Sequence, residues 1–185
     1  SPAMPTTARP PIRLALVGVG NCASSLVQGI HAYRTRGPDD VVGLMHPEIG
    51  PYRVTDVEVV AAFDVDARKV GKDLRDAVFA PPNNTMALAA DLPATGVTVR
   101  RGPVLDGVAP HMADHPPERT FVVAPGPEPT AAEVTAALRA SGAQLMVIYL
   151  PVGSERAARW HAQCALDAGL GLVNAIPVFL ASDAA

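Results

Sequence analysis

The sequence has few of the features that mark several common classes of protein. It contains two cysteines, Cys22 and Cys164, and its only lysines are Lys69 and Lys72, which the helical pattern places on a helix surface. A net charge of −3 gives no basic surface for nucleic acid or an anionic membrane. No apolar run approaches the roughly 20 residues that span a bilayer, and no signal-peptide core is present. We therefore expect no nucleic-acid or membrane partner, a cytoplasmic location, and buried, reduced thiols.

Side chains that carry out catalysis or bind metals also lack the necessary arrangement. The five histidines have no metal-ligand spacing, and none pairs with a serine or cysteine as an activated nucleophile would. No pair of groups suggests a general acid and base. We expect this chain to hold no metal site and no catalytic residue.

The chain does have a regular alternation of apolar segments. Its 185 residues, 49% of them apolar, suit one globular domain. Segments of strand length alternate with amphipathic helical ones, as in a parallel βαβ sheet. We expect strands at Ile12–Val17, Val57–Phe63, Val97–Arg100, Phe121–Val123, Leu145–Leu150 and Leu170–Asn174. We expect helices at Cys22–Tyr33, Ala67–Phe79, Ala131–Ser141 and Glu155–Ala168. The predicted fold is a Rossmann-like, doubly wound α/β domain over 12–185, with a tag remnant and flexible N-terminus at 1–11.

Helix ends are marked by capping residues. Asp66 is a candidate N-cap of the second helix, and Ser154 of the fourth. Thr130 and Glu133 form a capping box, and Gly142 follows the same helix as a C-cap. Two stretches rich in turn residues, at 34–56 and 80–96, have no clear period.

The first strand leads into a glycine motif of the G-x-G-x-x-A type. Gly18 permits a tight turn, and Gly20 lacks the Cβ that would keep a pyrophosphate away from the backbone. Ala23 is small enough for the helix to pack closely on the strand. The free amides of the helix start would then face the phosphates. The alternative interpretation is a plain βα turn, and the strand–turn–helix context favours dinucleotide binding.

An acidic residue, Asp64, ends the second strand. In dinucleotide-binding folds an acid at this point accepts hydrogen bonds from the adenosine ribose. Its distance from the glycines is about twice the usual 20 residues, an excess that the insertion at 34–56 explains. The alternative is a turn residue. Asp73, on the next helix, is most simply explained by surface solvation.

Two further segments are candidates for contact with a cofactor. Asn83, Asn84 and Thr85 follow the second helix, where amides suit a ribose or carboxamide but also suit an ordinary turn. Tyr149–Glu155 is a second strand–turn–helix junction, whose exposed amides suit either a cofactor or a simple helix start. The residues alone leave both alternatives open.

Several strings of residues, in order along the chain, resemble the bacterial, and particularly actinobacterial, inositol-3-phosphate synthase family. They are Val17–Gly29, Gly43–His46, Gly50–Tyr52, Ala61–Asp66, Asn83–Thr85, Arg101–Pro103, Tyr149–Glu155 and Ala181–Asp183. The resemblance implies NAD as the cofactor and conversion of glucose 6-phosphate to 1D-myo-inositol 3-phosphate by oxidation, enolisation, aldol cyclisation and reduction. It also implies that NAD contacts a set of residues: Gly18, Gly20, Asn21, Cys22, Ala23, Asp64, Asp73, Asn84, Tyr149, Pro151, Ser182 and Asp183.

The resemblance also implies what the chain does not contain. In the family, the residues for enolisation, cyclisation and phosphate binding come from a segment after this point, together with a sheet used for oligomerisation and a C-terminal return to the Rossmann domain. We therefore expect an incomplete Rossmann-like sheet, a tendency to form homo-oligomers, and no activity on glucose 6-phosphate unless the missing half is supplied. Two other functions remain open: an NAD-dependent dehydrogenase domain, and a non-catalytic nucleotide-binding or association module derived from the synthase.

Overall fold

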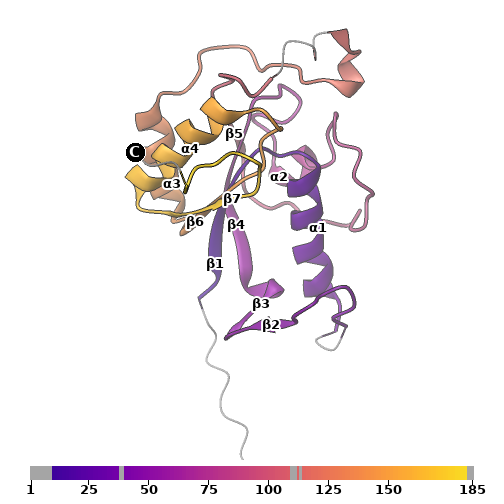
Figure 1. Ribbon diagram of the computed structural model, residues 1–185. Coiled ribbons are helices and arrows are strands. Elements are labelled where there is room, and N and C mark those ends of the chain that lie inside the picture. Colours follow the sequence, from indigo (N-terminus) through magenta and orange to yellow (C-terminus); the bar gives the residue numbers. More distant parts are fainter. Residues whose placement is uncertain (1–9, 38–39, 109–111, 113, 183–185) are drawn as a thin grey trace, which may run out of the picture.

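A five-stranded parallel sheet forms the centre of the molecule (Figure 1). The computed structural model describes residues 10–37, 40–108, 112 and 114–182. The strand order is β5-β4-β1-β6-β7, and every neighbouring pair is parallel. The strands are β1 (Ile12–Val17), β4 (Val57–Asp64), β5 (Val99–Arg101), β6 (Leu145–Ile148) and β7 (Gly171–Asn174). The chain moves outward from β1 through β4 to β5, and then returns to β6 and β7. This is the doubly wound, Rossmann-like order, and the predicted fold class is confirmed.

Helices cover both faces of the sheet, because side chains of a strand point alternately to opposite faces. Leu14 and Leu16 of β1 pack with residues of α1 (Asn21–Thr35) and α2 (Leu74–Ala77). Ala15 and Val17 pack on the other face with residues of α3 (Ala131–Ser141) and α4 (Glu155–Ala168). Figure 1 shows α1 on one side of the sheet and α3 with α4 on the other. The two apolar clusters fix the strand ends from which the site is built.

The third helix begins and ends as the sequence predicts. The Thr130 side chain accepts a hydrogen bond from the Glu133 amide, and the Glu133 carboxylate accepts one from the Thr130 amide. Gly142 ends α3 with φ of 66°, in the left-handed region. Ser154 does hold the N-cap position of α4, but its hydroxyl makes no capping bond. The Asp106 carboxylate takes that role instead, accepting from the amides of Arg156 at 2.7 Å and Ala157 at 2.8 Å.

The predicted helix at 67–79 is wrong for most of its length. Residues 67–72 form turns, and only Leu74–Ala77 is helical. Gly71 has φ of 83°, which a helix does not allow. Asp66 does not cap this helix, because its carboxylate is buried and bonded to Arg68. Asp73 caps α2, its side chain accepting from the Arg75 amide.

The irregular parts of the chain contain short elements that periodicity does not reveal. The insertion at 34–56 contains an antiparallel hairpin of β2 (Glu48–Ile49) and β3 (Tyr52–Arg53), followed by the 3-10 turn η1 (Val54–Asp56). Another 3-10 turn, η3, covers Pro117–Arg119. The strand predicted at 121–123 is wrong, since this segment makes only an isolated antiparallel bridge from Val123 to Asp66. Among the helices that the structure describes, none is long and apolar enough to cross a bilayer.

Candidate functional site

A cavity of about 340 Å³ lies at the carboxyl ends of the central strands. It is beside the switch point between β1 and β6, where the chain changes from one side of the sheet to the other. Parallel α/β sheets bind ligands at this kind of crevice. Residues after β1, β4, β6 and β7 line it, together with the loop at Gly102 and the face of α4 that carries His161. The cavity brings together a subset of the residues predicted from the sequence: Gly18, Gly20, Asn21, Cys22, Asp64, Tyr149 and Pro151.

The two glycines of the β1–α1 loop have different structural roles. Gly18 has φ of 89°, and a Cβ there would lie 2.6 Å from the Tyr149 carbonyl oxygen. Its amide donates to the Phe63 carbonyl at 2.9 Å. Both the backbone conformation and the close approach of the β6 end therefore require glycine at position 18. A Cβ on Gly20, in contrast, would meet no atom within 4 Å. Position 20 is open toward the cavity, as approach of a ligand to the backbone requires.

The N-terminus of α1 presents unpaired amides to this cavity. The first helical hydrogen bond runs from the Ser24 amide to the Gly20 carbonyl, so the preceding amides have no partner within the helix. No acidic residue lies in the first turn. The positive end of the helix dipole is therefore not neutralised locally. Ala23 is fully buried against the sheet.

Both cysteines are free thiols. Cys164 is buried as predicted, but Cys22 is exposed, because it lies on the first turn of α1 beside the cavity.

Asp64 holds the backbone of the glycine loop and lines the cavity. Its Oδ2 accepts from the Val19 amide at 2.7 Å, and its Oδ1 accepts from the amides of Val65 at 2.7 Å and Asp66 at 2.8 Å. An ionised carboxylate offers about four acceptor positions. These three bonds leave one position, on Oδ2, for a ligand hydroxyl.

Lys69 does not lie on a helix surface, as its sequence context predicts, but is fully buried beneath the glycine loop. Its Nζ donates to the Val19 carbonyl at 2.7 Å and to Asn83 Oδ1 at 2.8 Å. Burial lowers the pKa of Lys69, while the charges of Asp64 and Asp66 oppose that shift. The sequence gives no direct signal for this placement, because it depends on the turn at 67–72 that replaces the predicted helix.

The predicted amide pair at 83–84 divides between two roles. Asn83 Nδ2 donates to the Val19 carbonyl at 3.1 Å, which places Asn83 under the loop with Lys69. Asn84 lies at the start of α1, where its Oδ1 accepts from Asn21 Nδ2 at 2.8 Å and its amide donates to Asn21 Oδ1 at 2.9 Å. Asn84 therefore lies beside the cavity and orients Asn21, which lines it.

Two of the predicted residues, Asp73 and Ser182, lie away from this cavity. Asp73 accepts hydrogen bonds from Arg75, Thr95 and Gly96, ahead of β5 and at the opposite end of the sheet. Ser182 lines separate hollows along α4 and the segment after β7. Asp183 lies outside the described residues.

His161 lines the cavity, although its spacing from other residues in the sequence does not identify it as a site residue. It is 2% exposed, and its ring lies 5.0 Å from that of Trp160 and 6.2 Å from that of Phe63, centroid to centroid. Burial lowers the pKa of His161 to about 4. Its Nδ1 is buried without a hydrogen-bond partner. The available signal was helical periodicity, which puts His161 on the same buried face as Ala157 and Ala165.

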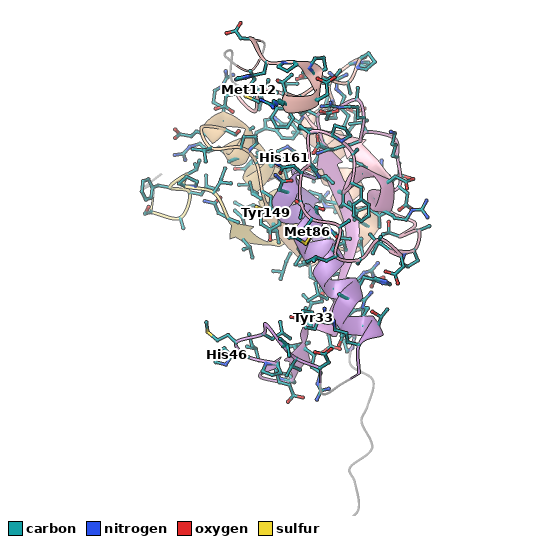
Figure 2. All side chains as sticks on the ribbon, turned by 90° about the vertical axis from the view of Figure 1, so that its right-hand side faces the viewer. Tyr33, His46, Met86, Met112, Tyr149 and His161 are labelled. Carbon is teal, nitrogen blue, oxygen red and sulfur yellow. The ribbon has the colours of Figure 1, made fainter. Side chains whose placement is uncertain are left out.

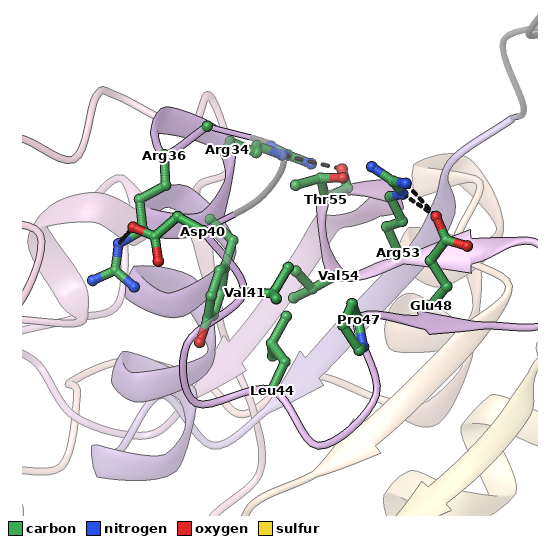
Figure 3. Close-up of a pocket in the computed structure, with 12 residues that line it drawn as sticks. Arg34, Arg36, Asp40, Val41, Leu44, Pro47, Glu48, Arg53, Val54 and Thr55 are labelled. Carbon is green, nitrogen blue, oxygen red and sulfur yellow. Dashed lines mark hydrogen bonds and ion pairs between the residues drawn. The ribbon is translucent and has the colours of Figure 1, made fainter.

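A second, larger cavity of about 620 Å³ lies at the other end of the sheet, between the end of α1 and the hairpin (Figure 3). Its arginines are satisfied within the chain. Arg34 donates to backbone carbonyls at Thr55 and Val57, and Arg53 pairs with Glu48. Figure 2 shows Tyr33, beside this cavity, well apart from Tyr149 and His161. Among the described residues, no group of three or more His, Cys, Asp or Glu side chains could hold a metal ion.

Comparison with known proteins gives one consistent result. No family model matches the sequence. The chain is 54% identical over 173 residues to the inositol-3-phosphate synthase of Mycolicibacterium smegmatis, a match that covers 93% of this chain and 45% of that protein. The chain thus spans less than half the length of this curated relative. The crystal structure of Ari2 matches with a TM-score of 0.75 and 34% identity, over 91% of this chain and 46% of that one. A myo-inositol-1-phosphate synthase-related protein from Thermotoga maritima has the same fold, with a TM-score of 0.63 and 20% identity over 94% of this chain and 50% of that one.

Proposed function

We propose that this chain is the NAD-binding portion of an inositol-3-phosphate synthase, because over 93% of its length it is 54% identical to the synthase of Mycolicibacterium smegmatis. The observation that carries the proposal is the open position at Gly20, where unpaired helix amides meet a cavity at the switch point between β1 and β6. The free amides and the positive dipole of such a helix start suit the negative charge of a pyrophosphate.

The residues of the cavity fit a dinucleotide along its length. The Gly20 loop and the first turn of α1 would hold the pyrophosphate, since this end carries no local acid. Asp64 has one acceptor position left for an adenosine ribose hydroxyl. Tyr149 and Pro151, after β6, line the part of the cavity that the nicotinamide half would occupy. When bound, NAD would accept a hydride from a sugar carbon and return it.

The chemistry beyond hydride transfer is proposed to need residues that this cavity does not supply. Enolisation and ring closure require a base and a cation near the developing oxyanion. The Lys69 ammonium already donates to Val19 and Asn83, beneath the loop, and is fully buried. His161 is buried, and its pKa is lowered to about 4 by burial, so its ring is neutral near pH 7. We infer that the glucose 6-phosphate steps depend on other parts of the longer family proteins.

Isothermal titration of NAD into the purified chain tests the proposal. We expect saturable binding, and we expect Gly20→Val to abolish it, because a branched side chain would fill the open position. Gly29→Ala, in the middle of α1 and also free of contacts at its Cβ position, is the control that should bind normally. No binding by the wild-type chain, or normal binding by a folded Gly20→Val variant, would contradict the proposal.

The same titration with NADP tests the assignment of Asp64. A carboxylate beside the ribose repels the 2′-phosphate, so NAD should bind more tightly by about 1–3 kcal/mol. We compare the two cofactors on the wild-type chain and not on an Asp64 variant, because removing the Asp64 carboxylate would also release the amides of Val19, Val65 and Asp66. Equal affinities would exclude Asp64 from the ribose site.

A further inference from the structure

Both polar groups of Val19 are held from the side of the loop that faces the protein interior. The Val19 amide donates to Asp64 Oδ2 at 2.7 Å. The Val19 carbonyl accepts from Lys69 Nζ at 2.7 Å and from Asn83 Nδ2 at 3.1 Å. Lys69 is fully buried, and Asn83 Oδ1 accepts a second bond from its Nζ. A buried cation with two partners thus fixes the direction of one peptide group in the loop.

The direction of that carbonyl determines the direction of the next amide. In a trans peptide the C=O of one residue and the N–H of the following residue point in opposite directions. Since the Val19 carbonyl points toward Lys69, the Gly20 N–H points away from it, to the side on which Gly20 lines the cavity. None of the backbone hydrogen bonds found outside helices and strands in the described residues uses the Gly20 N–H. This donor is therefore directed outward and left free.

We propose that Lys69 is a positioning residue, which holds the Val19–Gly20 peptide so that its N–H donates to the pyrophosphate of a bound dinucleotide. This inference rests on the proposed function of the cavity. Lys69 acts mainly by fixing the direction of this peptide group. Its net charge matters less, because the charges of the Asp64 and Asp66 carboxylates offset that of the Lys69 ammonium. Without the Lys69 donor, only the longer bond from Asn83 Nδ2 holds the Val19 carbonyl. The peptide then turns over more easily and presents an oxygen to the phosphates, which would repel them.

Lys69→Met tests this inference, because methionine keeps much of the apolar side chain and removes the donor. The matched control is Lys72→Met, which makes the same change in charge at the exposed second lysine, three residues away. The probes are NAD, ADP-ribose and adenosine, of which only the first two contain a pyrophosphate. We expect Lys69→Met to bind NAD and ADP-ribose about tenfold or more weakly, while adenosine binding and the Lys72→Met variant change less than about twofold.

The outcomes separate this inference from the proposed function. If the wild-type chain binds none of the probes, the proposed function fails. If the wild-type chain binds NAD and a folded Lys69→Met variant binds it equally well, Lys69 does not position the peptide. The same conclusion follows if the variant loses affinity for adenosine by the same factor as for NAD. If Lys69→Met does not fold, the wild-type chain still provides a test by amide NMR. ADP-ribose should then shift the Gly20 amide proton downfield and adenosine should not, and an unmoved Gly20 signal at saturation would overturn the inference.

Discussion

A buried histidine in the cavity wall makes the stability of the fold depend on pH. His161 is 2% exposed and packs between Phe63 and Trp160, with no partner for Nδ1. Burial lowers the pKa of His161 from 6.5 to about 4. Between these two values the unfolded chain binds a proton that the folded chain does not. The free energy of unfolding should therefore fall as the pH drops from 6.5 toward 4, by roughly 3 kcal/mol at most.

Urea denaturation at a series of pH values measures this effect. His161→Gln, which cannot titrate, should remove most of the slope between pH 6.5 and 4, whatever its own effect on stability at neutral pH. His46→Gln is the control, because His46 is exposed. A slope that persists unchanged in a folded His161→Gln variant would assign the pH dependence to other groups.

Single residues were predictable from the sequence where a local backbone requirement identified them. Gly18 could be assigned because a tight βα turn needs a positive φ, and its φ is 89°. Lys69 could not be assigned, because its burial depends on contacts with Val19 and Asn83 that lie 50 and 14 residues away. Asp64 lines the cavity, but its bonds to three backbone amides were not predictable from spacing.

At the scale of elements, the long amphipathic helices form where the apolar periodicity of the sequence predicts them. The segment after β4 has such a periodicity but is mostly not helical. The α3 helix has an apolar stripe, a capping box and a glycine C-cap, so local signals agree with the fold. Residues 67–73 belong to the helix predicted at 67–79, but long-range bonds override the helical pattern there. The Arg68 guanidinium binds both oxygens of buried Asp66 and also the carbonyls of Pro117 and Thr120. This contact fastens the segment to η3 and the residues after it.

We expect Arg68→Ala to lower the free energy of unfolding by about 2–3 kcal/mol. Removing the cation leaves the Asp66 carboxylate buried and unpaired, and the partial exposure of Arg68 reduces the cost below that of a fully buried pair. Arg75→Ala is the matched control, since the Arg75–Asp76 pair is exposed and should contribute less than about 1 kcal/mol. Urea unfolding curves with equal slopes compare the two variants, and equal losses of stability would contradict the role given to Arg68.

At the scale of the whole molecule, the doubly wound, parallel fold class could be predicted because alternating strands and helices leave few topologies for a parallel sheet. The hairpin at 48–53 and the cavity beside it could not, because a hairpin of two-residue strands has no periodic pattern. The chain spans 45% of its Mycolicibacterium smegmatis relative, and we therefore propose NAD binding for it and not the whole synthase reaction.

The 185-residue chain alone should not convert glucose 6-phosphate to inositol phosphate. NAD binding supplies only the redox step, and the base and phosphate-binding groups are not found around the cavity that the described residues form. Incubation with glucose 6-phosphate and NAD, followed by phosphorus NMR, measures the conversion. A full-length family synthase is the positive control. Turnover at a comparable rate by this chain would show that its own residues suffice.

The central claim is that NAD occupies the cavity at the glycine loop, and amide chemical-shift mapping tests it most directly. A series of two-dimensional NMR spectra recorded while NAD is added reports on this cavity and on the larger one beside the hairpin in one experiment. We predict that the largest shifts fall on Gly18, Gly20, Asn21 and Cys22, while Arg34, Val41 and Leu44 beside the larger cavity stay unchanged. Shifts concentrated at the larger cavity, or none at the glycine loop with NAD in excess, would contradict the account.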